Sequence, residues 1–173
     1  MSMRTRLSAL ETALENEKRE REFYLAHAKR TRNSLGKAMF RQIADDELEH
    51  YERLKELYRV WESKGSWPGT VPLKVENTVV KDILKNMIDK AKSEPTGDID
   101  DLAALKEAID FEAAGASFYA RLRDEVNDPK EKAFFNLLAD IEHEHYVSLK
   151  DTEELLTDPA SWFRVNERLT LDG

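Results

Sequence analysis

Apolar side chains recur at helical spacing in four long segments of the chain, with polar side chains between them. These segments span residues 7–30, 35–61, 102–125 and 129–156. Ser8 and Glu11 form a capping-box pattern near the start of the first segment. Asn127-Asp128-Pro129 supplies an N-cap and a first-turn proline for the fourth. The pattern predicts an all-α protein with four long helices.

The sequence between and after these helices has a different pattern. Gly- and Pro-containing breaks at residues 65–69 and 93–97 enclose a short amphipathic segment from Val79 to Ile88. After Thr157 the chain looks irregular, and Trp162 and Phe163 are expected to pack back onto the helices. We therefore expect one domain, divided into a hairpin (7–61), a crossover (62–101), a second hairpin (102–156) and an irregular tail (157–173).

The two hairpins repeat each other. A shift of 95 positions places several residues of the first hairpin on identical residues of the second. They are Glu17 on Glu112, Glu47 on Glu142, His50 on His145, and Phe23-Tyr24 on Phe118-Tyr119. No gap is needed within either hairpin. Each half of the chain is therefore predicted to be the same helix–turn–helix unit.

The spacing of these polar residues directs them to the core. Residues seven apart are nearly eclipsed on a helix, so Glu17 shares a stripe with Tyr24 and apolar Leu10. Glu47 and His50 are three apart and share one face, and the second hairpin repeats both arrangements. In each hairpin the midpoint between the two glutamates falls in the predicted turn, so both carboxylates should lie at one level of the bundle. The sequence predicts four carboxylates and two imidazoles at one depth.

Such a buried group of carboxylates must protonate or bind cations. Two divalent ions fit four carboxylates and two imidazoles. Carboxylate and imidazole ligands without thiolates favour iron or manganese, and the affinity of such ligands for zinc allows that metal as well. The predicted ligands are Glu17, Glu47, His50, Glu112, Glu142 and His145.

Three neighbouring positions leave alternatives open. Glu20 lies one turn after Glu17, but its repeat partner is Gly115. It is either a seventh ligand, a supporting carboxylate behind the ligands, or a solvated side chain. Tyr24 and Tyr119 are either core aromatics or, as we expect, hydroxyl donors to ligand carboxylates. His27 and His143 lie off the ligand stripes and are expected at the surface.

Composition excludes several classes of function. The formal net charge of −8 argues against a nucleic-acid binder, which would carry a basic stripe. The absence of cysteine excludes disulfides, zinc–thiolate sites and iron–sulfur clusters within these residues. No stretch approaches the roughly 18 apolar residues that span a bilayer, and residues 1–6 lead into polar sequence without a signal core. We expect a soluble, cytoplasmic protein without a membrane or nucleic-acid partner.

Four motifs resemble those of the rubrerythrin group in the ferritin-like superfamily. They are Glu17-x6-Tyr24, Ala44-Asp-Asp-Glu-Leu-Glu-His50, Glu112-x6-Tyr119 and Ala139-Asp-Ile-Glu-His-Glu-His145. The resemblance implies a ferritin-like four-helix bundle and two iron ions. It also implies that Glu47 and Glu142 bridge the ions, that Glu17 and Glu112 are terminal ligands, and that each ion takes one histidine.

The resemblance also implies a function, and the chain departs from the family in two ways. The implied activity is peroxide reduction, or oxygen activation, at the di-iron centre. Rubrerythrins proper carry a four-cysteine rubredoxin domain that supplies electrons, so here a separate electron-donor protein is expected. Their extra glutamate lies on the third helix, where this chain has Gly115, and Glu20 stands on the first helix instead.

Non-catalytic metal handling is the alternative function, either as iron storage or as a structural metal site. Ferritin cages use longer bundles with an extra C-terminal helix, and the tail of this chain looks too short and irregular for one.

The crossover predicts the topology. Residues 62–101 can travel the length of the bundle, roughly 40 Å for a helix of about 27 residues. We therefore expect the second and third helices to run parallel, joined by one long crossover. The same length would allow the second hairpin to dock on another protomer. A homodimer is expected, with exchanged hairpins as one form of it.

Overall fold

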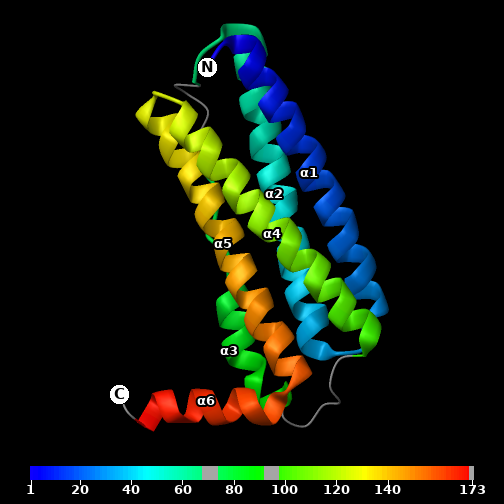
Figure 1. Cartoon of the computed structure of the whole chain (residues 1–173). Coiled ribbons are helices and arrows are strands. Elements are labelled where there is room, and N and C mark those ends of the chain that lie inside the picture. Colours follow the sequence, from blue (N-terminus) through cyan, green and yellow to red (C-terminus); the bar gives the residue numbers. More distant parts are fainter. Residues whose placement is uncertain (68–73, 92–97, 172–173) are drawn as a thin grey trace.

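The computed structural model describes residues 1–67, 74–91 and 98–171, and their secondary structure is helical. The helices are α1 (Met3–Arg30), α2 (Ser34–Lys64), α3 (Val80–Ala91), α4 (Ile99–Glu125), α5 (Pro129–Thr157) and α6 (Pro159–Leu171). Helices α1 and α2 form one hairpin and α4 and α5 the other, and the hairpins pack together as a four-helix bundle (Figure 1). None of the described helices combines the length and apolarity needed to cross a membrane.

Capping residues set the two hairpin turns. Asn33 precedes α2 and accepts a hydrogen bond from the amide of Gly36, at 2.9 Å. Asp128 precedes α5 and accepts from the amides of Lys130 and Glu131, with Pro129 in the first turn as the sequence predicted. The helix α2 ends at Gly65, whose φ of 63° is the left-handed conformation that glycine adopts without strain.

Helices α2 and α4 run in the same direction, and α1 and α5 run opposite to them (Figure 1). The crossover returns from the end of α2 to the start of α4, and α3 within it packs on α2 and α5. This is the ferritin-like topology expected from the length of the crossover. The predicted break at residues 65–69 begins at Gly65, directly after α2. Residues 68–69 of this break and the whole of the break at 93–97 lie outside the described residues.

Two expectations were wrong, both at chain ends. The capping box at Ser8 and Glu11 does not form, because α1 begins earlier and Ser2 caps it by accepting a hydrogen bond from the amide of Thr5. The tail is not irregular. Asp158 accepts from the amide of Ser161 at 3.0 Å and starts α6 directly after α5. Trp162 and Phe163 of α6 pack against the core, as expected.

The core of the bundle is two apolar clusters separated by a polar layer. One cluster surrounds Phe40 at the end where α1 turns into α2, and the other surrounds Phe135 at the opposite end. On each of the four bundle helices, the predicted ligands lie in sequence between the residues of one cluster and those of the other. The polar layer is therefore closed off by apolar side chains along the bundle axis.

Candidate metal centre

The structure brings the six predicted ligands together in the polar layer, and none of them is more than 1% exposed. They form two groups, and within each group the ligand atoms all lie within 4.8 Å of one another. The first group is Glu17, Glu47, His50 and Glu142, and the second is Glu47, Glu112, Glu142 and His145. Glu47 and Glu142 belong to both groups, so their carboxylates lie between two positions that could each hold an ion.

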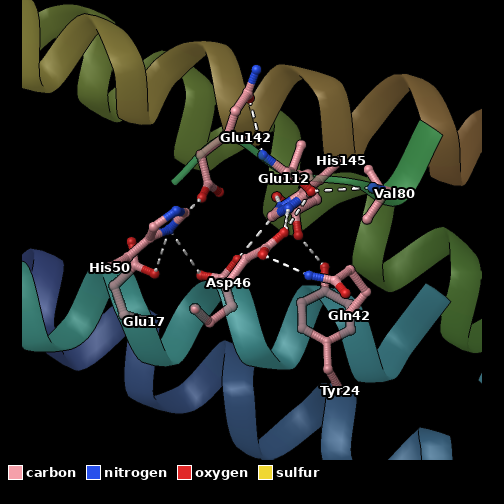
Figure 2. A network of polar contacts seen from close by, with 12 residues as sticks. Glu17, Tyr24, Gln42, Asp46, His50, Val80, Glu112, Glu142 and His145 are labelled. Carbon is pink, nitrogen blue, oxygen red and sulfur yellow. Dashed lines mark hydrogen bonds and ion pairs between the residues drawn. The ribbon is translucent and has the colours of Figure 1, made fainter. Parts of the chain in front are cut away.

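Both histidines face the carboxylates with the same ring nitrogen. His50 Nδ1 lies 3.3 Å from Glu17 Oε2 and 3.4 Å from Glu142 Oε1. His145 Nδ1 lies 3.2 Å from Glu112 Oε2 and 3.5 Å from Glu47 Oε1. The imidazole rings lie nearly parallel, with centroids 6.4 Å apart. Equivalent residues of the two hairpins thus make equivalent contacts, and Figure 2 shows His50 beside Glu17 and Glu142 and His145 beside Glu112.

Several carboxylate oxygens of the layer are buried without a hydrogen-bond partner. They are Glu17 Oε2 and both oxygens of Glu47 and of Glu142. A buried carboxylate oxygen without a donor is costly, and a bound cation is one of the few groups that can compensate for it. These residues therefore fit a pair of divalent ions.

Burial and mutual repulsion shift the ionisation of the centre. Burial and the neighbouring carboxylate of Glu142 raise the pKa of Glu47 well above its usual value. Burial and Glu112 do the same to the pKa of Glu142. For His145, burial acts in the opposite direction, but the Glu112 carboxylate prevails and the pKa rises to about 10. Without metal the layer therefore retains protons, which ions must displace.

The two tyrosines on the ligand stripes donate hydrogen bonds across the bundle. Tyr24 on α1 donates to Glu112 Oε1 on α4, and Tyr119 on α4 donates to Glu17 Oε1 on α1. Burial and these carboxylates raise the pKa of both hydroxyls well above the usual value, so both keep their protons. Each hydroxyl orients one carboxylate oxygen and leaves the other free to face an ion.

Glu20 is buried, with 5% exposure, so the solvated alternative is wrong. It belongs to neither of the two ligand groups found among the described residues. Burial, followed by the charges of Glu142 and Glu17, raises its pKa to about 10. At the equivalent position of α4, a Cβ on Gly115 would lie 2.5 Å from Glu142 Oε2. The Glu142 side chain occupies the space that a larger residue there would need.

The residues expected outside the centre lie outside it. His143 is exposed. His27 is half-buried rather than fully at the surface, because its ring lies 4.4 Å from that of Phe23.

Sequence reasoning assigned no role to Asp46, whose Oδ2 lies 2.7 Å from His145 Nε2. Asp46 stands one helical turn before His50, which could have indicated that it faces inward. That it would reach the histidine of the other hairpin could not be read from the spacing.

Comparison with known families agrees with this site. The family model of rubrerythrin matches residues 8–153, which contain most of both hairpins and all six predicted ligands. The chain belongs to the rubrerythrin family. Comparisons with curated proteins and with solved structures give no match. Membership of this family and the buried Glu/His cluster together fit a di-iron carboxylate protein.

Proposed function

We propose that this rubrerythrin-family chain binds two iron ions between its hairpins and reduces hydrogen peroxide with electrons from a separate donor. Glu17, His50, Glu112 and His145 would be terminal ligands, and Glu47 and Glu142 would bridge. The observation that carries the proposal is the pair of buried carboxylates, Glu47 and Glu142, that belong to both ligand groups and whose oxygens accept no hydrogen bond.

The chemistry divides between the ions and the protein. Two ferrous ions, when bound, would supply the two electrons that, with two protons, convert one peroxide molecule into two water molecules. The hydroxyls of Tyr24 and Tyr119 hold the terminal carboxylates in place. Without metal, burial and the charges of Glu142 and Glu17 raise the pKa of Glu20, which then keeps its proton beside the ligands. These 173 residues contain no cysteine, so an iron–sulfur or rubredoxin-type electron source must lie outside them.

Metal analysis after anaerobic loading with ferrous iron tests the centre itself. The wild-type chain should bind two ions, whereas Glu47→Ala and Glu142→Ala should each lose the second, because each removes a bridging carboxylate. Two ions per chain in either variant would contradict the bridging assignment.

Stopped-flow oxidation of the diferrous protein tests the reaction. Peroxide should oxidise the centre faster than oxygen does at equal concentration, and turnover should require an added reductant. Faster oxidation by oxygen would favour a ferroxidase instead.

Iron storage is the second candidate function, because α6 is a helix and the objection based on an irregular tail no longer holds. Storage predicts a large assembly and many irons per chain. Light scattering of the purified protein and its iron content after aerobic loading would distinguish it from the two-iron enzyme.

A further inference from the structure

Asp46 connects the metal centre to the crossover. Its Oδ2 atom accepts from His145 Nε2, on the side of the ring opposite the carboxylates, and its Oδ1 atom accepts from Gln42 Nε2 at 2.9 Å (Figure 2). The carboxylate of Asp46 thus faces Nε2 of the His145 ring, while Nδ1 of the same ring faces the ligand carboxylate of Glu112.

Thr78, just before α3, completes this network. Its hydroxyl donates to Asp46 Oδ2 at 2.5 Å and accepts from the amide of Val80 at 3.4 Å. One helical turn further along α2, the Glu49 carboxylate accepts a hydrogen bond from the backbone amide of Glu76, at 3.1 Å. Glu76 lies two residues before Thr78 in the crossover. Residues 76–78 of the crossover thus lie along α2, and the Thr78 side chain holds the carboxylate that contacts His145.

The other half of the repeat has no counterpart of this network. The position on α5 that corresponds to Asp46 is Ile141, which is fully buried and offers no acceptor. The position that corresponds to Gln42 is Leu137. The two ligand groups match in their carboxylates and imidazoles, but only His145 receives a carboxylate from the equivalent position on the facing helix.

This difference affects how each histidine binds metal. A carboxylate on Nε2 keeps the proton there, directs the Nδ1 lone pair at the ion, and makes the imidazole more basic. It also holds the ring in one orientation, so less freedom is lost when an ion binds. Glu20 belongs to neither of the two ligand groups found among the described residues.

We propose that Asp46 is a positioning residue for His145 and makes the two metal positions unequal. The position of Glu112 and His145 binds its ion first, and the position of Glu17 and His50 binds second and releases its ion first. Thr78 strengthens the first position by holding Asp46. This inference rests on the proposed two-metal centre.

Single-site backgrounds allow the two positions to be measured separately. His50→Ala leaves the position of His145, and His145→Ala leaves that of His50. Isothermal titration of each full-length apo variant with Co(II) should give tighter binding in His50→Ala. Adding Asp46→Asn should weaken Co(II) binding by about 10- to 100-fold in the His50→Ala background and leave the His145→Ala background unchanged. Thr78→Val should act in the same direction with a smaller effect.

The neighbouring residue Asp45 provides a matched control, because it is exposed and Asp45→Asn removes the same charge from α2. It should leave Co(II) affinity unchanged in both backgrounds. A measurement that needs no histidine variant is nitrogen-15 NMR of the Zn(II)-loaded wild-type chain. It should show His145 protonated at Nε2, with that proton exchanging faster in Asp46→Asn.

Two results of the Co(II) titrations would overturn the inference about Asp46. Equal weakening by Asp46→Asn in both backgrounds would mean that Asp46 supports the fold in general, and equal affinities of the two backgrounds would mean that the positions are equivalent. Either result overturns the inference while the two-metal centre stands. A wild-type chain that binds neither Co(II) nor Fe(II) would instead contradict the proposed function.

Discussion

Glycine 115 shows how one missing side chain shapes the centre. Alanine is the better helix former, yet a Cβ here would lie 2.5 Å from Glu142 Oε2 and 3.3 Å from Glu142 Cδ. In the first hairpin the equivalent residue is Glu20, so the two halves of the repeat differ beside the predicted bridging carboxylate.

We predict that Gly115→Ala displaces the Glu142 carboxylate and weakens metal binding about tenfold or more, with little change in the stability of the apo protein. Titration with Mn(II) and urea unfolding in EDTA would measure the two effects. Gly36→Ala is the control, because the nearest atom to a Cβ at that position is at an ordinary 3.6 Å. Equal Mn(II) affinity of both variants would show that Glu142 can move without loss.

The two tyrosines give a second prediction at this scale. Tyr24→Phe leaves Glu112 Oε1 without its donor, and Tyr119→Phe does the same to Glu17 Oε1. Each should lower the free energy of unfolding of the apo protein by about 1–3 kcal/mol, the usual cost of leaving a buried hydrogen-bonding group without its partner. Tyr58→Phe, which removes an exposed hydrogen bond to Glu11, should cause no measurable change in urea unfolding.

At the scale of helices, an ion pair joins the first turns of α1 to the start of α5. Arg6 Nε lies 2.9 Å from Glu131 Oε1, and the side chains are 14% and 1% exposed. The Arg6 guanidinium also lies 3.8 Å from the centre of the Trp61 ring on α2. Burial raises the pKa of Glu131 even though Arg6 opposes it. This contact ties three bundle helices together at the end distant from α6.

Arg6→Met should therefore destabilise the fold strongly, by about 3 kcal/mol, because it leaves a buried carboxylate without its partner. The double variant Arg6→Met/Glu131→Leu should recover most of that loss, which thermal and urea unfolding would both detect. Arg53→Met, which breaks a surface pair with Glu56, should cost much less. Equal losses in the two single variants would show that burial does not strengthen the Arg6 pair.

For the whole molecule, the polar layer makes stability depend on pH and metal together. In the folded apo protein the pKa values of Glu47, Glu142, His50 and His145 are raised. Each group therefore stabilises the fold fully below its unfolded pKa and loses that contribution as pH rises through its folded pKa. Glu17 and Asp46 have lowered pKa values, so their contributions change only in acid.

The apo protein should thus become less stable as pH rises from about 6.5 towards 10, the range set by the usual histidine value and that of folded His145. The affinity for metal should rise over the same range, because ions displace the retained protons. Urea unfolding in EDTA, and Zn(II) titration in buffers of different ionisation enthalpy, would measure both trends. Apo stability that increases with pH would contradict this account of the layer.

The sequence alone determined the parts of this protein that depend on periodicity. Residues seven apart share a helix face whatever the helix packs against, so the stripes of Glu17 and Glu112 could be assigned without a structure. Some helix ends were also predictable, because they depend on hydrogen bonds between residues close in the chain. The start of α5 at Asp128 and Pro129 is one of them. The repeat then required the two hairpins to present equivalent faces, and the long crossover favoured the parallel arrangement of α2 and α4.

Tertiary structure decided the contacts between residues that are distant in the chain. Asp46 reaches His145, 99 positions away, and Thr78 holds it from the crossover. Arg6 contacts Glu131 across the bundle. Helical spacing gives the direction of a side chain on its own helix, but the partner that it meets depends on how helices are placed in three dimensions. The repeat made the two halves of the site look equal, and packing against α2 and the crossover made them different.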